Sequence, residues 1–235
     1  MIWEFLKLTL ITVIIGLLVV FIIVLIRLQQ PLDLPKRTII LSSAIEQMKN
    51  GDLVAVSYSS TRGKLVKVFT GSMWTHIGMI YRPNPNEIYV IESASYDDKS
   101  GVIKTPWEEW FDWNYRKILA WVPCRSQIGC DQIDKIYSKV AGSEVNLWVV
   151  DWLKTMIKQP RNRKTSEGKD RYYCSELIAY LLQELDLLDK KHEPSGYPPK
   201  ELIFSLKSYD APYLIAGSLG PKGALASPAT LPPRY

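Results

Sequence analysis

The sequence Tyr-Tyr-Cys-Ser-Glu-Leu-Ile-Ala-Tyr at residues 172–180 places Cys174 at the start of an amphipathic helix that we predict from Tyr173 to Leu188. At a helix N-terminus, unpaired backbone N–H groups and the helix dipole stabilise a thiolate, which lowers the pKa of the cysteine. The same N–H groups, including that of Cys174, can hold the oxyanion of a tetrahedral intermediate. Cys174 is therefore a candidate nucleophile, although its position alone also fits an ordinary buried cysteine.

Two predicted strands upstream carry a candidate base and its partner. The segments 76–81 and 88–93 are predicted strands, joined by the turn at residues 82–86. A hairpin of this kind makes His76 and Glu92 cross-strand neighbours. A carboxylate beside an imidazole fixes its tautomer, as the third member does in thiol hydrolases. Taken singly, His76 also fits a packing role and Glu92 a solvated strand end.

The remaining elements are predicted to place strands early in the chain and helices late. We expect strands at 52–58 and 117–122, helices at 43–49, 64–70, 131–140 and 144–157, and a loop at 158–171. Ser43 is expected to cap the first of these helices, and Thr105 to cap another that begins at Pro106. This order favours an α+β fold with an antiparallel sheet over a doubly wound α/β fold.

Four short motifs follow one another in a recognisable order. They are Gly51-Asp-Leu-Val, Thr75-His-Ile-Gly-Met-Ile, Val90-Ile-Glu-Ser-Ala and Tyr173-Cys-Ser-Glu-Leu-Ile. Over about residues 42–205 the chain resembles the permuted NlpC-type papain-like superfamily, in particular its YiiX-like branch, which has bacterial and poxviral members. The resemblance implies a permuted papain-like domain in which the histidine strand precedes the cysteine helix.

The resemblance also implies roles for single residues. It makes Cys174 the nucleophile, His76 the base and Glu92 the orienting group of a cysteine hydrolase. Gly51 and Asp52 would be structural, at the start of the first strand. Tyr58, at the end of that strand, is a candidate for binding substrate or the oxyanion.

Composition restricts the other classes of function. The formal net charge is +5, but no nucleic-acid-binding motif accompanies it. Three cysteines and two histidines lack zinc-ligand spacing, so we expect neither a metal nor a cofactor. Cys124 and Cys130 are interpreted as structural, and His192 as solvated. In the basic loop before Cys174, Lys169 and Arg171 are candidates for binding an acidic substrate or anionic lipid, and a solvated loop is the alternative.

The N-terminus carries an unbroken run of apolar residues plus Thr and Gly from Leu8 to Ile26. About 19 helical residues span roughly 28 Å, the thickness of a bilayer core, so we predict one transmembrane helix. More basic residues follow the run than precede it, which places the larger domain in the cytoplasm, or in the virion interior of a viral protein. The expected divisions are an anchor at 1–27, a linker at 28–41, the hydrolase domain at 42–208 and a flexible tail at 209–235.

Two aromatic or proline-containing segments leave alternatives open. Trp107, Trp110 and Trp113 recur every three residues, as in a helix that packs on a sheet or one that dips into a membrane interface. The chain ends in Pro-Pro-Arg-Tyr, so Pro232, Pro233 and Tyr235 match the ligand of WW domains.

The sequence therefore favours one function and leaves one alternative open. The first is a membrane-anchored thiol hydrolase or acyltransferase that cleaves an amide or ester of an acyl lipid or a peptide-type substrate. The alternative is a non-catalytic membrane adaptor that recruits WW-domain proteins through its tail.

Overall fold

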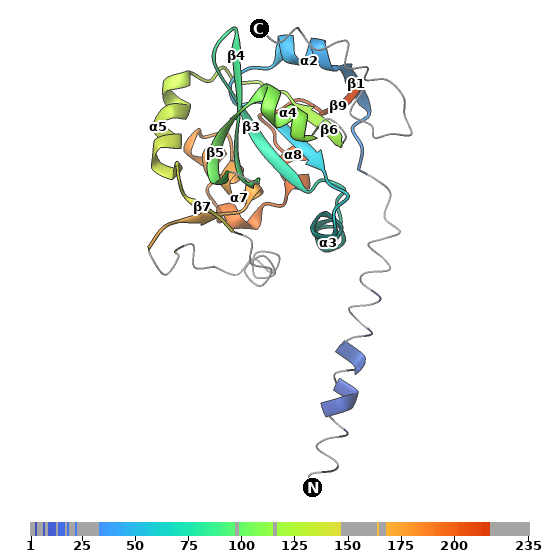
Figure 1. Cartoon of the computed structure of the whole chain (residues 1–235). Coiled ribbons are helices and arrows are strands. Elements are labelled where there is room, and N and C mark those ends of the chain that lie inside the picture. Colours follow the sequence, from blue (N-terminus) through green and yellow to red (C-terminus); the bar gives the residue numbers. More distant parts are fainter. Residues whose placement is uncertain are drawn as a thin grey trace.

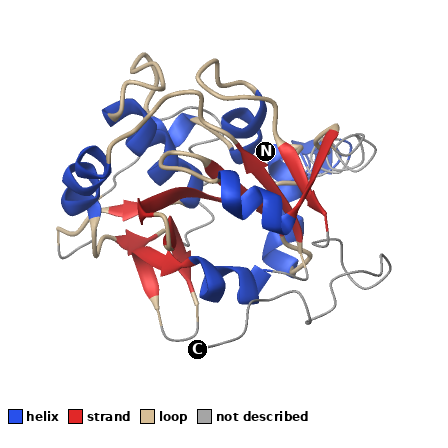
Figure 2. Cartoon of the chain, turned by 90° about the horizontal axis from the view of Figure 1, so that it is seen from above, coloured by secondary structure: helices blue, strands red, loops and turns tan. Residues whose placement is uncertain are grey.

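The computed structural model describes isolated positions between Trp3 and Ile22, and then residues 33–96, 99–114, 117–146, 164 and 168–216. The described chain forms one large sheet with helices around it (Figures 1 and 2). In sheet order the strands are β1 (Arg37–Ile40), β9 (Tyr213–Ala216), β6 (Ile118–Val122), β2 (Leu53–Ser57), β3 (His76–Asn84), β4 (Glu87–Ser95) and β5 (Ser100–Pro106).

Neighbouring strands of this sheet are antiparallel except for β1 and β9, which are parallel. The helices are α2 (Leu41–Gln47), α3 (Thr61–Thr70), α4 (Trp107–Asn114), α5 (Cys130–Val140), α7 (Cys174–Glu184) and α8 (Pro199–Phe204), with a 3-10 turn, η1, at Pro194–Gly196. A second small sheet pairs β7 (Glu144–Val145) with β8 (Arg171–Tyr172). The predicted α+β class with an antiparallel-dominated sheet is confirmed.

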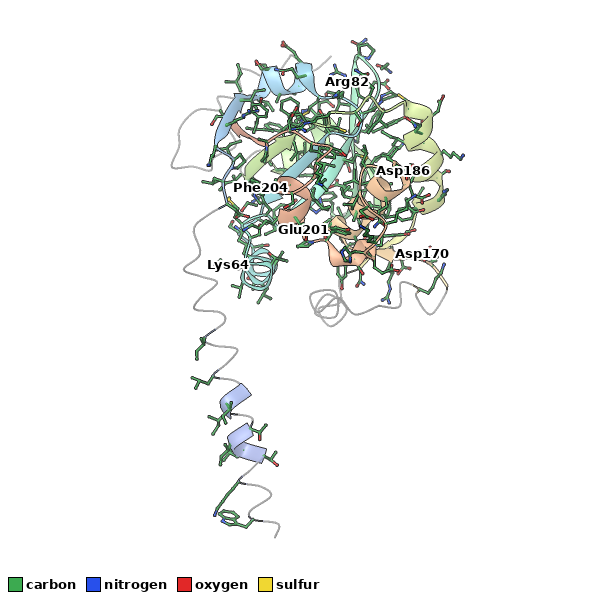
Figure 3. All side chains as sticks on the ribbon, turned by 180° about the vertical axis from the view of Figure 1, so that it is seen from behind. Lys64, Arg82, Asp170, Asp186, Glu201 and Phe204 are labelled. Atoms are coloured by element: carbon green, nitrogen blue, oxygen red, sulfur yellow. The ribbon has the colours of Figure 1, made fainter. Side chains whose placement is uncertain are left out.

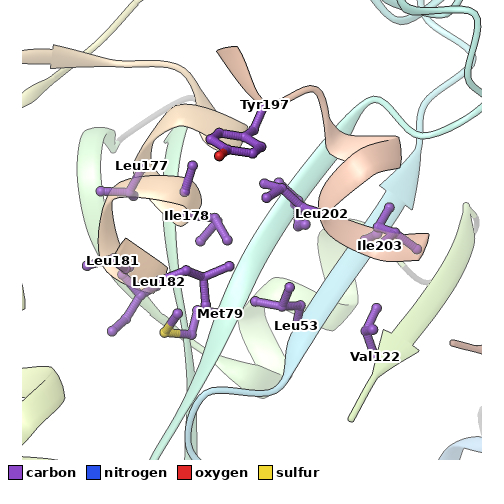
Figure 4. Close-up of a cluster of buried hydrophobic side chains, with 14 of the residues drawn as sticks. Leu53, Met79, Val122, Leu177, Ile178, Leu181, Leu182, Tyr197, Leu202 and Ile203 are labelled. Carbon is purple, nitrogen blue, oxygen red and sulfur yellow. The ribbon is translucent and has the colours of Figure 1, made fainter. Parts of the chain in front are cut away.

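Helices cover both faces of the sheet, which explains why its central strand has no solvated side. Successive residues of β2 enter different cores: Leu53 packs with α7, whereas Val54 packs with α4. All five residues of β2 are buried. Figure 4 shows the first core, where Leu53 and Met79 face Leu177 and Leu182 of α7. This packing fixes α7, and with it Cys174, against the middle of the sheet.

Three predicted helix starts are wrong, and in the first two a strand runs directly into the helix. The first helix begins at Leu41, straight after β1, and its N-cap residue Ile40 makes no side-chain cap. Ser43 therefore lies inside the helix. Thr105 belongs to β5, and α4 begins at Trp107. The predicted helix at 144–157 is also wrong at its start, because Glu144 and Val145 form β7; residues 147–157 lie outside the described part.

The sheet extends beyond the expected hydrolase domain at both ends. Strand β1 lies in the segment expected as a linker, and β9 lies in the segment expected as a tail. The two pair with each other in register from Arg37 with Tyr213 to Ile40 with Ala216. The Pro-Pro-Arg-Tyr terminus lies outside the described residues, so its role stays a prediction.

The apolar N-terminal run is described only at scattered positions. Within the described residues, no helix combines the length and the apolar character needed to cross a bilayer. The anchor stays a prediction.

Two of the three tryptophans of α4 belong to the core. Trp107 is 4% exposed and Trp110 is fully buried, and both pack in the second core. Trp113 is half-buried, and its ring is tilted against that of Tyr96, with centroids 3.8 Å apart. The core alternative is therefore confirmed for Trp107 and Trp110.

Candidate active site

Cys174 is the first residue of α7, as the sequence predicted. The start of this helix is fixed by two contacts. Glu176 Oε2 accepts a hydrogen bond of 3.2 Å from the backbone N–H of Tyr173, the N-cap residue. Ser93 Oγ donates to the carbonyl oxygen of Tyr172 at 2.7 Å, which ties the chain before Cys174 to β4. Cys174 as a whole residue is half-buried.

His76 is the first residue of β3 and is 7% exposed. The residues before it are held firmly. Trp74 is fully buried, and Thr75 donates its backbone N–H to Val56 O at 2.9 Å. Thr75 Oγ1 also accepts from the backbone N–H of Tyr58 at 2.8 Å. The imidazole therefore projects from a strand end whose backbone is hydrogen-bonded to β2.

His76 and Glu92 are cross-strand partners, as predicted. His76 Nε2 lies 2.6 Å from Glu92 Oε2. The pairing of Met79 with Ile91 sets the register of β3 and β4 that brings the two residues together. Gly78 lies between them on β3, and a Cβ there would be 3.6 Å from the Cβ of Glu92. The absence of a side chain at Gly78 keeps the space beside Glu92 open.

The Glu92 carboxylate is fully buried and accepts three further side-chain hydrogen bonds. Thr105 Oγ1 donates to Oε1 at 2.8 Å, and Trp110 Nε1 donates to Oε2 at 3.0 Å. The Tyr96 hydroxyl lies 3.1 and 3.0 Å from the two oxygens. A buried carboxylate needs such donors because burial otherwise disfavours its charge. The solvated role considered for Glu92 is therefore wrong.

The thiol and the imidazole are hydrogen-bonded side chain to side chain. Since Glu92 occupies Nε2, Nδ1 is the nitrogen left for the sulfur. Burial alone would raise the pKa of the Cys174 thiol, but the charge and hydrogen bond of His76 and the backbone N–H groups of Ile77 and Ser175 lower it below 9.0. The geometry thus favours a thiolate.

The charge on the imidazole is favoured by the same neighbours. Burial alone would lower the pKa of His76, but the charge and hydrogen bond of the Cys174 sulfur and the hydrogen bond with the Glu92 carboxylate raise it well above 6.5. Opposite shifts in two touching groups are what a thiolate–imidazolium pair requires. This arrangement can carry out nucleophilic attack on a carbonyl carbon and then deliver a proton.

Tyr58 lies beside this pair. Its ring centroid is 6.0 Å from that of His76, and its hydroxyl donates to Asn114 Oδ1 at 2.7 Å. Burial raises the pKa of Tyr58 above 10.0, which keeps the hydroxyl protonated at neutral pH. The residue is therefore well placed to contact a substrate, and that role stays a prediction.

The basic candidates Lys169 and Arg171 lie just before the nucleophile in the chain. Arg171 starts β8, opposite Glu144 of β7, and its guanidinium donates to Lys164 O at 3.3 Å. Lys169 is exposed. Most of the loop at 158–171 lies outside the described residues, so the proposed contact of Lys169 and Arg171 with an acidic substrate stays a prediction.

The sequence reasoning missed the residues that hold Glu92. Tyr96 carried no motif, Thr105 was interpreted as a helix cap, and Trp110 was noted only as part of a tryptophan stripe. A signal for Thr105 was present: a hydroxyl followed by Pro106 was interpreted as a helix cap, and the same hydroxyl instead donates to a carboxylate because β5 extends through Pro106. Asn114, which accepts the Tyr58 hydroxyl, was likewise not predicted.

The residues interpreted as structural are placed accordingly. Gly51 has φ +84°, and a Cβ there would lie 2.1 Å from Ile128 Cδ1, so only glycine fits. Asp52 is fully buried and accepts from Cys124 N at 2.7 Å and from Trp121 Nε1 at 2.8 Å. His192 is exposed.

Cys130 begins α5, and its sulfur accepts from Asn50 Nδ2 at 3.2 Å. Cys124 is 1% exposed. Across the part of the chain that is described, three or more His, Cys, Asp or Glu side chains do not gather in a group that could hold a metal ion.

No family model matches the chain, and no curated protein matches it either. Among solved structures, the chain is similar to the metalloprotein yiiX from Escherichia coli O157:H7, assigned to DUF1105. That similarity has 18% sequence identity and a TM-score of 0.41, and it covers 74% of this chain and 92% of the other.

Proposed function

We propose that this protein is a membrane-anchored thiol hydrolase or acyltransferase that cleaves an amide or ester bond. The observation that carries the proposal is the continuous contact from Cys174 through His76 to the buried Glu92. The sulfur is the nucleophile, the imidazole is the base and acid, and Glu92 holds the imidazole in one orientation. Thiol hydrolases use this division of roles.

In the first half of the reaction, the Cys174 sulfur attacks the carbonyl carbon of the substrate. A C–S bond forms and the carbonyl π electrons move to the oxygen. The backbone N–H of Cys174, at the first position of α7, is an unpaired helix donor suited to that oxyanion. The C–N or C–O bond to the leaving group then breaks, and the His76 imidazolium gives its proton to the departing amine or alcohol.

In the second half, water or an acceptor alcohol attacks the thioester. His76, now neutral, removes a proton from the attacking oxygen as the new C–O bond forms. The C–S bond breaks and the thiolate–imidazolium pair is restored. Water as the acceptor gives hydrolysis, and an alcohol gives acyl transfer. The anchor would place this chemistry at a membrane, where acyl lipids and membrane-associated peptides are both substrates of the right bond type.

Alkylation by iodoacetamide tests the nucleophile without knowledge of the substrate. We expect Cys174 to react at neutral and mildly acidic pH, because its thiolate persists below the usual thiol range. In His76→Ala the charge and the hydrogen bond on the sulfur are lost, so the pH profile should move to higher pH. Labelling is read site by site by mass spectrometry.

Cys130 is the matched control, because it is half-buried as Cys174 is and also begins a helix. Its alkylation should not respond to His76→Ala. Equal labelling of Cys174 and Cys130 across the whole pH range, or a Cys174 profile unchanged by His76→Ala, would refute the proposed site. Cys124 reports unfolding, since it is 1% exposed in the native fold.

A further inference from the structure

We propose that α3 and Leu34 form a surface that rests on the lipid bilayer and holds the end of the domain that carries the site against it. This inference rests on the anchoring included in the proposed function and adds a second, peripheral membrane contact on the domain itself. The surface consists of the exposed residues of α3 together with Leu34, and its occupant is a membrane with anionic headgroups.

The chain from the predicted anchor enters the domain at Asp33, which is hydrogen-bonded to the residues that follow α3. Asp33 Oδ2 accepts from Ser72 Oγ at 2.8 Å, and Asp33 Oδ1 accepts from Met73 N at 2.9 Å. Trp74 Nε1 donates to the Asp33 carbonyl oxygen at 3.1 Å. The N-terminal segment is therefore fixed to the residues 72–74 that connect α3 to His76.

Only a short stretch of chain separates Asp33 from the apolar run. Asp33 is seven residues after Ile26, the last residue of that run. Seven residues span at most ~25 Å when fully extended. If residues 8–26 lie in a bilayer, the loop at 72–74 and the adjoining α3 stay within this reach of its surface. A tether this short gives a weak surface contact a high effective concentration.

Helix α3 itself combines basic residues with an exposed apolar one. The helix contains Arg62, Lys64 and Lys67 and no acidic residue. Lys64 is exposed, and Leu65 is 48% exposed. Leu34, next to the fixed Asp33, is 38% exposed. Exposed apolar side chains among basic ones suit an interface that offers acyl chains and anionic headgroups together.

Asp33, the acidic residue that fixes the chain beside α3, does not offset this charge. Its carboxylate accepts from Ser72 Oγ and also pairs with Lys200 Nζ at 3.7 Å. Its side chain is only 12% exposed. Helix α3 itself therefore offers positive charge to the outside.

Helix α3 also lies close to the residues around His76. Gly63 of α3 packs so closely on Tyr58 that a Cβ there would lie 2.7 Å from the Tyr58 carbonyl oxygen. Tyr58 in turn lies beside His76. Figure 1 shows α3 at the same end of the sheet as the start of β3, where His76 lies. A membrane under α3 would thus face the end of the domain that carries the reactive groups.

Lipid-borne quenchers test the contact directly on the full chain in vesicles. A fluorophore is attached at Leu65→Cys in a Cys130→Ser, Cys174→Ser background, in vesicles of phosphatidylcholine and phosphatidylserine that contain a doxyl-labelled lipid. We expect quenching at residue 65 but none at a control probe on Lys190→Cys. Lys190 pairs with Asp186, which lies across the domain from Lys64 in Figure 3.

Charge reversal supplies the second variant. Lys64→Glu with Lys67→Glu should abolish the quenching at residue 65 in the anionic vesicles, whereas Lys190→Glu should leave it unchanged. Quenching at residue 65 equal to that at residue 190 would overturn the inference. Shielding of residue 65 from aqueous iodide without lipid quenching would also overturn it, because a second copy of the chain would then cover α3.

The two proposals fail separately. Because the quenching is measured with Cys174→Ser, its result does not depend on catalysis. A full chain that does not associate with vesicles defeats both the anchor and the α3 contact. A vesicle-bound chain with an unquenched residue 65 defeats the α3 contact alone. An unreactive Cys174 leaves the membrane contact standing.

Discussion

At the scale of single residues, the site depends on how Glu92 is held. Four side chains, from β3, β5, α4 and the residue that follows β4, direct hydrogens at one buried carboxylate. Such a group has little freedom to rotate, so it fixes the plane of the His76 ring. The ring in turn offers its other nitrogen to Cys174. The orientation of the His76 ring toward Cys174 thus originates in residues that do not touch Cys174.

Replacing Glu92 separates this positioning from bulk. In Glu92→Gln the size is kept but the negative charge beside His76 is lost, so the pKa of His76 falls and the Cys174 thiolate loses part of its charged partner. We expect the alkylation profile of Cys174 to move to higher pH. The amide would also direct N–H groups at existing donors, which costs about 1–3 kcal/mol of stability.

Glu92→Ala is the harsher comparison. It leaves Thr105 and Trp110 with unpaired buried donors and His76 without its counter-charge, so we expect a loss of about 3–5 kcal/mol in the free energy of unfolding. Thermal unfolding measures the stability, and alkylation measures the site. A normal alkylation profile in a folded Glu92→Gln protein would show that the carboxylate does not position the base.

At the scale of elements, the close contact of β3 with β4 depends on Gly78. A Cβ there would lie 2.4 Å from Val90 Cγ1 and 3.2 Å from Ile91 O. Gly78→Ala should therefore push the two strands apart between His76 and Glu92. We expect a loss of about 1–3 kcal/mol of stability, as in other overpacked cores, and slower alkylation of Cys174.

A double-mutant cycle identifies the cause. Val90→Ala removes the obstructing methyl group, so Gly78→Ala should cost less in that background than in the wild-type protein. Gly196→Ala is the control, because no atom lies within 4 Å of the Cβ it would add. Strictly additive effects of Gly78→Ala and Val90→Ala would contradict this account of the strand contact.

Local pattern was enough to predict some elements and not others. The cysteine helix, the hairpin of β3 and β4, and β6 were predictable because apolar periodicity and turn residues mark them in the sequence. Strand β5 was not, because its Thr-Pro end looks like a helix start and the pairing with β4 that makes it a strand is not local. Strands β1 and β9 were missed because each has only four residues and pairs with a partner from the opposite end of the chain.

The residues of the site, like the elements, were predictable from local sequence only in part. The helix start at Cys174 and the meeting of His76 with Glu92 in a hairpin were predictable from local pattern, whereas the roles of these residues were implied by the family resemblance. Thr105 and Trp110 were not predictable, because only the register of β4 with β5 and the packing of α4 bring them to Glu92. Tyr96, just after β4, carries no local signal for its contact with Glu92.

At the scale of the whole molecule, Asp52 makes stability depend on pH. Burial raises its pKa from 3.8 to about 6, although N–H donors of Cys124, Lys49 and Trp121 act in the opposite direction. Between these values the native protein binds a proton that the unfolded chain has released. This contribution is fully present below pH 3.8 and is lost as pH rises through about 6, a change of about 2–3 kcal/mol.

The difference between the wild-type protein and Asp52→Asn isolates this contribution. Asparagine does not titrate, so the gap in melting temperature between the two proteins should change between pH 4 and pH 7 in favour of the wild type at the lower value. Other titrating groups cancel in the comparison. A gap that stays constant over this interval would show that Asp52 is already ionised in the native protein at pH 4.

The parallel pairing of β1 with β9 has a mechanical consequence. The N-terminal segment leaves β1 at Arg37, and the C-terminal segment leaves β9 at Ala216, which is the opposite end of the paired strands. Tension applied between the two ends of the chain would slide the strands along each other and load their evenly spaced hydrogen bonds all at once, rather than opening them one after another. A protein held at one terminus and pulled at the other would therefore resist in shear, with the hairpin of β3 and β4 outside the line of force.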